Sequence, residues 1–537
     1  MCFNENLKAI YFEQIINIIK MKRRAFLKNT TVFTLPAFFG GMDVAAMPSR
    51  MMEEMINGDS DKVLVLIDLN GGNDGLNTFV PLDGYDNLAN ARANVIIPQN
   101  KLLDMTDTIG LHPELTGVKN LYDNANLTLV QGVGYPNQNR SHFRSGDIWN
   151  TGVHASDYKS TGWVGRYLDD SFPGYPQDFP TTDCPDPFAI TMGKSISGTC
   201  QGMDSNFSMA IINTNNIGGL STGIEAPLSN DCYGEELAFL VDTYKKSNVY
   251  ADRVLDAIDM GSSNEDLYPD TTLAQQMKVV AKLISGGLQT KIFVLKLGGF
   301  DTHGDQVDAA DTTKGKHAWL LKTLSDAIWA FQQDLKLLGL EERVLGMTFS
   351  EFGRKIISNG GIGTDHGSAG PMMIFGQCVN QGVVGDNPVI AGQVDSDEGV
   401  AMQYDFKWVY GSILMDWFGV EEDKVKALLS DDFQYLPIVG SCEEVVRTEE
   451  IVNIMETKAF PSPFDQTFNL KFSLLENEEV KIDLSNVEGK EMKVISNKKY
   501  TSGEHQILIE AHGLPSGVYF VRIQAGNGVK TLRVVKQ

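Results

Sequence analysis

Carboxylate, imidazole and hydroxyl side chains recur in this 537-residue chain directly beside apolar runs that predict buried strands. Three of the eight histidines of the chain fall in this set. Carboxylates and imidazoles gathered in one place are ligands for a divalent cation, and a hydroxyl beside them can be activated as a nucleophile. We therefore expect a divalent metal site, with zinc, manganese or calcium as the ion. The residues expected there are Asp74, Ser141, His142, Asp301, His303, Glu351, Arg354, Asp365 and His366.

The elements that position these residues follow from hydrophobic periodicity. Apolar runs predict strands at 63–67, 127–131, 291–297, 343–350 and 372–375, and amphipathic patterns predict helices at 115–123, 273–284 and 317–338. Strands and helices in alternation predict an α/β domain, with a doubly wound, mostly parallel sheet covered on both faces. In such sheets ligands bind at the carboxyl ends of the strands, which is where the polar residues occur.

Each polar loop also has a structural alternative. The glycine-rich segment 71–75 could be only a tight turn, and Asp301 with His303 could cap the next helix. The pair Asp365-His366 could be a surface turn. Carboxylate and imidazole residues recur after four predicted strands, and this recurrence favours a metal site over separate turns and caps.

The residues expected to act on a substrate have alternatives of the same kind. Ser141 could be an N-cap for a helix through 143–149, although N–H groups at a helix start would equally favour an anionic group. Arg140 and Arg354 could clamp an anion bidentately or form structural salt bridges. His142 could be a general acid or base, or a structural residue.

The N-terminus resembles a twin-arginine export signal, because Lys22-Arg23-Arg24-Ala25-Phe26-Leu27-Lys28 precedes a mildly apolar stretch at 30–42. We expect residues 1–46 to comprise an upstream extension and this signal, with the twin-arginine translocase as a partner. No later run reaches the ~18 apolar residues of a membrane span, so none is expected in the mature chain.

Five of the six cysteines follow the predicted cleavage point, which leaves at least one thiol without a disulfide partner inside the chain. Export to an oxidising compartment makes a disulfide among Cys184, Cys200 and Cys232 an expectation, with the pair left open. These three lie in residues 151–270, a stretch rich in Gly, Ser, Asn and Pro. We expect that stretch to be an inserted cap or long loops within a domain of residues 47–441.

The C-terminal segment 460–537 has short alternating runs, which predict a small all-β sandwich after a linker at 442–459. It resembles the C-terminal sorting domain of type IX secretion substrates, through Phe460-Pro461-Ser462-Pro463-Phe464, the strand at 517–523 and the terminal Val535-Lys536-Gln537. Ser462 departs from the Asn usual in that family. The resemblance implies the type IX machinery as a partner, and release or attachment at the cell surface; a generic adhesive β-module is the alternative.

The central motifs resemble the bacterial family of domain of unknown function 1501. They are Gly71-Gly72-Asn73-Asp74-Gly75, Arg140-Ser141-His142-Phe143, Gly298-Gly299-Phe300-Asp301-Thr302-His303, Ser350-Glu351-Phe352-Gly353-Arg354 and Asp365-His366-Gly367. That family is similar to the alkaline phosphatase and sulfatase superfamily. The resemblance implies an alkaline-phosphatase-like core whose metal centre attacks phosphate or sulfate esters.

Carried over to this chain, the resemblance implies Ser141 as nucleophile and Asp74, Asp301, His303 and His366 as metal ligands. The chain departs at Phe352, where the superfamily has an imidazole that binds metal. The expected function is therefore an exported metal-dependent hydrolase of anionic esters. A non-catalytic surface binding or assembly protein on the same fold is the alternative.

Net charge excludes one class of partner. The chain has 45 Lys and Arg against 69 Asp and Glu, which gives −24, and an acidic surface disfavours nucleic acid. Residues 460–537 hold ten basic and nine acidic side chains, so the acidity belongs to the central domain. Clustered carboxylates would repel one another without a cation, which is a further reason to expect one.

Overall fold

The structure is a computed structural model that describes residues 61–212, 249–440, 442, 454–474, 477–486, 490–525 and 528–537. The predicted export signal within residues 1–46 lies outside these ranges. None of the helices in the described parts has the length and apolar character that a membrane crossing requires.

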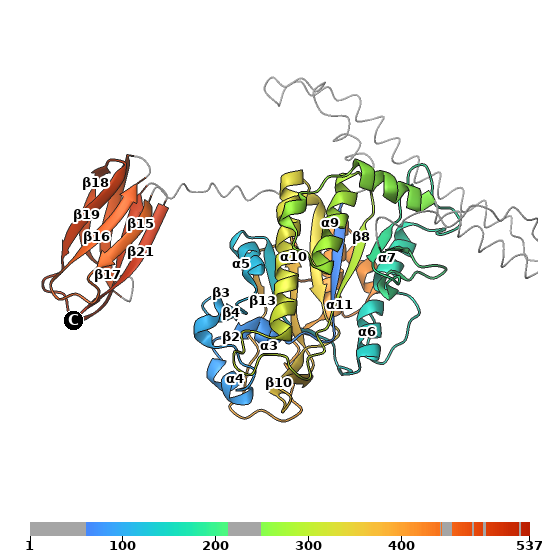
Figure 1. Ribbon diagram of the computed structural model, residues 1–537, viewed down its shortest axis with the longest axis horizontal. Helices are drawn as coiled ribbons and strands as arrows, with labels where there is room; N and C mark the ends of the chain where they lie inside the picture. The colour runs from blue at the N-terminus through green and yellow to red at the C-terminus, as the bar shows by residue number, and fades with distance from the viewer. Residues whose placement is uncertain are drawn as a thin grey trace, which may run out of the picture. The chain divides into compact units, whose positions relative to one another are not determined.

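A nine-stranded sheet forms the centre of the α/β domain (Figure 1), in the order β13-β5-β12-β9-β1-β8-β6-β7, with β14 paired to β5. Its strands are β1 (Val63–Asn70), β5 (Leu127–Gly134), β6 (Ala189–Met192), β7 (Ser208–Ile211), β8 (Ile292–Gly298), β9 (Val344–Phe349), β12 (Gly370–Phe375), β13 (Gly382–Val384) and β14 (Tyr404–Asp405). Neighbouring strands pair in parallel except at β12, which runs antiparallel to both β5 and β9.

Helices cover both faces of this sheet, as the alternating pattern predicts. Alternate residues of β1 enter two different cores: Val65 and Ile67 pack into one, and Leu64 and Leu66 into the other. The first core contains α5 (Thr116–Asp123), α9 (Thr272–Ser285) and α10 (Lys316–Leu338). The second contains α6 (His142–Thr151), α7 (Trp163–Ser171), α11 (Phe406–Phe418) and α12 (Glu422–Leu428). The predicted doubly wound, mostly parallel sheet is confirmed.

Smaller elements complete the domain around the edge of the sheet where the polar loops lie. They are α3 (Gly75–Thr78), α4 (Tyr85–Ala91), the sheet of β2 (Phe79–Pro81), β3 (Leu103–Asp104) and β4 (Ile109–Leu111), and the hairpin of β10 (Arg354–Ser358) and β11 (Thr364–His366). The hairpin connects the loop after β9 to the start of β12.

The expectation for residues 151–270 needs correction, and the expectation of a disulfide is tested only for pairs that include Cys200. The described part of residues 151–270 is not only cap and loops, because β6 and β7 extend the main sheet and α7 packs on it. The buried run 189–192 is short and lies within a polar stretch, so hydrophobic periodicity gives little indication of a strand there.

The disulfide of the described residues joins Cys378 to Cys442, whose Cα atoms are 4.3 Å apart. Cys200 is instead a fully buried thiol, and Cys232 lies outside the described residues.

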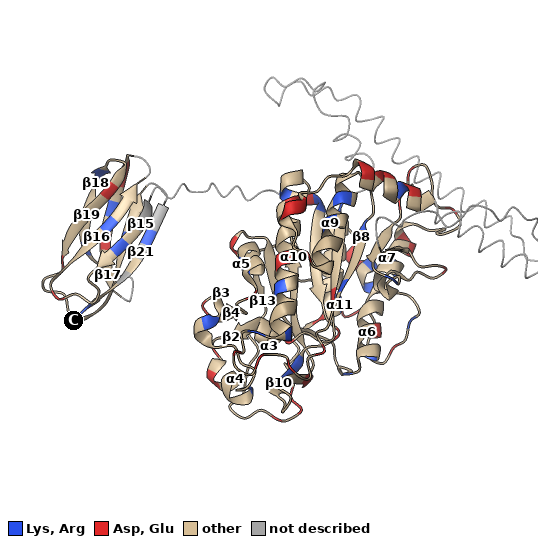
Figure 2. Cartoon of the chain, viewed as in Figure 1, with Lys and Arg blue, Asp and Glu red and all other residues tan. Residues whose placement is uncertain are grey.

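The C-terminal residues form two antiparallel sheets around their own apolar core, which confirms the predicted β-sandwich. One sheet contains β15 (Ile454–Phe460), β16 (Thr467–Leu474) and β19 (Gly503–Glu510). The other contains β17 (Glu478–Asn486), β18 (Glu491–Tyr500), β20 (Gly517–Ala525) and β21 (Gly528–Lys536). Basic residues are spread along these strands, whereas acidic residues occur on many helices and loops of the α/β domain (Figure 2).

Candidate metal centre

Three loops bring imidazole and carboxylate groups together at the edge of the sheet where β5, β8 and β9 end. His142 opens α6 after β5, and Asp301 and His303 follow β8. Asp365 and His366 end β11, immediately before β12. Because β12 is antiparallel, its first residue lies at the edge where its parallel neighbours finish, so this pair joins the same site.

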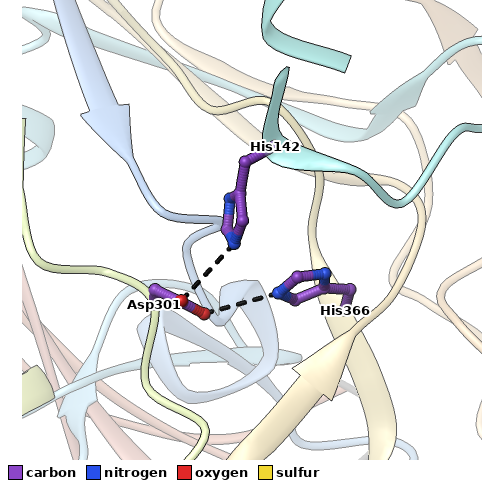
Figure 3. A group of neighbouring side chains, drawn as sticks. All are labelled: His142, Asp301 and His366. Carbon is purple, nitrogen blue, oxygen red and sulfur yellow. Dashed lines mark hydrogen bonds and ion pairs between the residues drawn. The ribbon is translucent and has the colours of Figure 1, made fainter. Parts of the chain in front are cut away.

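The carboxylate of Asp301 lies at the centre of the group, with His142 and His366 pointing toward it (Figure 3). Single ligand atoms of Asp301, His142 and His366 all lie within 4.8 Å of one another. The Nε2 atom of His142 is 3.5 Å from Oδ2 of Asp301, and the Nε2 atoms of His366 and His303 are 3.4 and 3.3 Å from Oδ1. Three imidazoles therefore present the same ring nitrogen to one carboxylate.

The other ring nitrogen of each histidine has an acceptor. Nδ1 of His142 is 2.8 Å from Oε1 of Glu351, and Nδ1 of His303 is 2.8 Å from Oδ1 of Asp365. Nδ1 of His366 is 2.7 Å from the carbonyl oxygen of Arg140. A carboxylate or carbonyl oxygen only accepts, so each neutral imidazole must hold its proton on Nδ1 and a lone pair on Nε2.

This arrangement of lone pairs fits a cation. Nε2 of His303 and Nε2 of His366 are only 2.8 Å apart, which is repulsive for two neutral rings that both carry their protons on Nδ1. Nε2 of His142 is buried and has no hydrogen-bond partner among the residues that the structure describes. A positive ion among His142, His366 and Asp301 would satisfy the Nε2 atoms of both of these histidines. Back-side acceptors of this kind are usual for metal-binding histidines.

The Asp301 side chain is 48% exposed, and its charged neighbours also favour the ionised carboxylate. Burial alone would raise its pKa, but the hydrogen bond and charge of Arg354, 2.9 Å away, together with His303 and His142, lower the pKa to about 2. Burial also lowers the pKa of His366, and the charge of Arg354 acts in the same direction. The centre thus favours a charged carboxylate beside a neutral imidazole, the protonation states that metal ligands require.

The glycine-rich turn after β1 contacts Glu351, the carboxylate that accepts from His142. The Gly71 N–H donates to both oxygens of Glu351, at 2.9 and 3.1 Å. Gly71 has φ of 122°, and a Cβ there would lie 2.2 Å from the backbone nitrogen of Asp301. Only glycine permits this approach. The glycine-rich motif is therefore not only a tight turn. Its Gly71 N–H holds the Glu351 carboxylate, which in turn orients His142.

Phe352, the departure from the superfamily pattern, packs against the imidazoles instead of binding a metal. Its ring centroid is 5.0 Å from that of His142 and 4.6 Å from that of His366. A Cβ on Gly72 would lie 2.3 Å from the Phe352 ring, so that glycine makes room for it. Phe352 forms an apolar wall that restrains both rings.

Asp74 is not placed in this group. Arg92 donates to its two oxygens at 2.9 and 2.8 Å, and Gln306 donates at 2.6 Å, with both Asp74 and Arg92 fully buried. Burial opposes ionisation, but the charge of Arg92 lowers the pKa of Asp74 below its ordinary value. Its carboxylate is thus used structurally. Nothing in the local sequence around Arg92 marks it as the partner, because the pairing depends on the tertiary fold.

Glu351 and Asp365, predicted as ligands, instead accept from the Nδ1 atoms of His142 and His303. Arg354 is fully buried and donates to Asp301 and to carbonyl oxygens of Gly71, Gly72, Phe300 and Thr364, so it holds the site together. Arg140 pairs with Asp397 at 2.9 Å. Neither arginine is available as the expected anion clamp without breaking these bonds.

Ser141 is exposed at the N-cap of α6, beside His142, and its side chain makes no capping hydrogen bond. Ser350, another hydroxyl near the centre, donates to the Leu69 carbonyl at 2.7 Å and accepts from the Asn73 N–H at 3.0 Å. The Ser141 hydroxyl is therefore the uncommitted one of the two.

Fold and site together define an α/β protein with a histidine-rich cluster at the carboxyl edge of its sheet. Residues 242–404 match the sequence model of the family described as "Protein of unknown function (DUF1501)", and residues 458–537 match that of the "Secretion system C-terminal sorting domain". Both resemblances expected from the motifs are confirmed. The sorting domain directs the chain through the type IX secretion machinery, to be secreted or attached to the cell surface.

The family match includes Asp301, His303, Glu351 and His366, whereas His142 lies N-terminal to it. A search of curated proteins found no match.

Solved structures with partial similarity include a protein of the alkaline phosphatase superfamily from Vibrio parahaemolyticus, at 10% identity and a TM-score of 0.31, covering 88% of this chain and 79% of that one. A phosphonate monoester hydrolase from Silicibacter pomeroyi has 12% identity and a TM-score of 0.28, covering 88% of each chain. A sulfatase from Pseudoalteromonas sp. has 10% identity and a TM-score of 0.28, covering 88% of this chain and 85% of that one. These values are too low to transfer an activity.

Proposed function

We propose that this chain is an exported metal-dependent hydrolase of phosphate or sulfate esters. The observation that carries the proposal is the group of three imidazole Nε2 atoms that face the Asp301 carboxylate while each Nδ1 is engaged by an acceptor. His142, His303, His366 and Asp301 would hold the ion. Three nitrogens and one carboxylate suit zinc, whereas calcium takes about six to eight oxygen ligands. A bound divalent cation would stabilise negative charge developing on the ester.

The residues of the chain supply the rest of the chemistry. The exposed Ser141 hydroxyl is the nucleophile in this proposal, since its oxygen has no structural role as a cap. The N–H groups and positive dipole end at the start of α6 favour the anionic group of an ester beside it. Glu351 and Asp365 orient His142 and His303, and Arg354 orients Asp301. Phe352 shields two of the rings from water.

We also propose that the twin-arginine translocase carries the chain across the inner membrane before the type IX machinery acts. The motif at 22–28 supports this step. The anionic surface makes nucleic acid an unfavourable partner.

One observation favours the alternative of a surface binding or assembly protein without turnover. Arg140 and Arg354, the two cations expected to clamp an anion, are both engaged in ion pairs. Such a protein would keep the metal centre but lack hydrolysis.

The test is hydrolysis of chromogenic phosphate and sulfate esters by zinc-loaded protein. We expect Ser141→Ala to lose hydrolysis while it retains metal, and His366→Ala to lose both. His512→Ala, an exposed histidine of the sandwich, is the matched control and should behave as wild type. Full activity of Ser141→Ala would overturn the assigned nucleophile. Stoichiometric metal with no turnover of either ester class would favour the binding protein.

A further inference from the structure

Beside the metal centre, a cavity of about 320 Å³ lies among α6 and the ends of β1, β8 and β9. His142 and Glu351 line it and also belong to the centre. We infer that this cavity binds a neutral, polyhydroxylated group, a sugar residue. For the proposed function, on which this part of the inference rests, that sugar would be the alcohol portion of the ester.

Charge balance in the cavity favours a neutral ligand. Three carboxylates line it, and each has a cationic or hydrogen-donating partner: Asp68 has Lys296 at 3.7 Å, Glu351 has His142 at 2.8 Å, and Asp147 has Arg144. A ligand of either charge would have to compete with one of these pairs, at the cost of an uncompensated charge. A neutral ligand with hydroxyl groups can bond to the same atoms and leave the pairs intact.

Both kinds of hydrogen-bonding group are available there. The carboxylates accept, and the side-chain NH₂ groups of Asn70 and Asn150 make no hydrogen bond among the described residues. A sugar hydroxyl is at once a donor and an acceptor, so it can use both.

Aromatic side chains supply the apolar part of the recognition. Trp149 lines the cavity with only 3% of its surface exposed, and its indole N–H is buried with no hydrogen-bond partner in the described part of the chain. Such a donor costs free energy unless a ligand or water satisfies it. Phe143 also lines the cavity, yet this residue is 92% exposed. A sugar ring has C–H faces that would cover this phenyl ring while its hydroxyls reach the polar groups.

The test uses the full-length protein and ligand-detected NMR with a panel of methyl glycosides of hexoses, deoxyhexoses and N-acetylhexosamines. We expect millimolar binding of at least one glycoside, weakened about tenfold in Phe143→Ala and in Asn70→Ala. Both side chains can be shortened without opening a buried core. Trp319→Ala, which removes an exposed aromatic residue that does not line the cavity, should bind as wild type does.

Asp301→Asn separates this inference from the proposed function. Because the cavity does not include Asp301, this variant should still bind the glycoside when its metal is lost. Glycoside binding without ester hydrolysis in wild type would sustain the cavity assignment and count against the hydrolase. Absence of binding across the whole panel, stronger binding of choline than of any glycoside, or undiminished binding by Phe143→Ala would overturn the assignment, even if chromogenic esters are hydrolysed.

Discussion

Oε1 of Glu351 lies 2.8 Å from Nδ1 of His142, and the same carboxylate accepts the Gly71 N–H. The turn after β1 is thereby connected to the orientation of an imidazole that opens α6. Since Glu351 accepts at Nδ1, the Nε2 lone pair of His142 must face Asp301. Glu351 is a positioning residue in this account and His142 is a ligand.

Removing this acceptor should weaken metal binding. Glu351→Ala is expected to lower zinc affinity about 10- to 100-fold, because loss of a residue that orients a ligand has an effect of that size. Glu351→Gln keeps an oxygen that can accept from Nδ1 and should recover most of the affinity. Competition with a chromophoric chelator measures both values, with circular dichroism as a check of folding. Equal affinity of Glu351→Ala and wild type would contradict the positioning role.

Breaking the buried pair of Asp74 and Arg92 should affect stability, not metal content. Asp74→Ala leaves a guanidinium buried without its carboxylate, which is expected to cost about 3–5 kcal/mol in the free energy of unfolding. Urea unfolding measures the loss, and the folded fraction should still hold its ion. If Asp74→Ala were stable but free of metal, Asp74 would be a ligand after all.

Asp68 should make stability fall as pH rises. Its pKa of about 7 in the folded protein is above the value of about 4 for an exposed aspartate, so between these pH values the folded state holds more protons than the unfolded state. The contribution is present below about pH 4 and is lost as pH rises through about 7. We expect about 1–3 kcal/mol, since 23% exposure of the side chain screens part of the shift.

Asp68→Asn should flatten this part of the pH profile of urea unfolding. The exposed Asp107→Asn serves as its control. An unchanged slope in Asp68→Asn would show that another group titrates.

The disulfide should stabilise the α/β domain by restricting its unfolded chain. Cys378 and Cys442 are 64 residues apart, so Cys442→Ser is expected to lower the free energy of unfolding by about 2–4 kcal/mol. Thermal unfolding with and without reductant measures this. Reductant should destabilise wild type and leave Cys442→Ser unchanged; an equal effect on both would mean that the lost stability comes from elsewhere.

Much of the fold follows from local patterns. The apolar run 63–67 and the long amphipathic stretch 317–338 correspond to β1 and α10, because periodicity depends on which face a residue buries. Strand direction does not follow from such patterns. The apolar run of β12 resembles the runs of its neighbours β5 and β9, but β12 is antiparallel to both. That reversal is what brings His366 to the edge where Asp301 lies.

The sequence predicts which residues gather at the site. It does not predict what each of them does there. Imidazoles after successive strands predict a metal, yet the sequence does not distinguish a proposed ligand such as Asp301 from a residue such as Asp365, which accepts from His303. The sequence pattern places Asp74 at the metal, because its partner Arg92 is identified only by the fold. The predicted repulsion among carboxylates does not arise, since Asp74, Asp301 and Glu351 each have a partner of their own.

The central claim is that three histidines and Asp301 hold a divalent ion. Elemental analysis of the exported protein, after incubation with zinc and removal of free metal, tests it most directly. We predict about one ion per chain in wild type and in His512→Ala, and almost none in Asp301→Asn or His366→Ala, all four being folded. Absence of bound zinc or any other divalent metal in wild type, or equal content in all four proteins, would contradict the account.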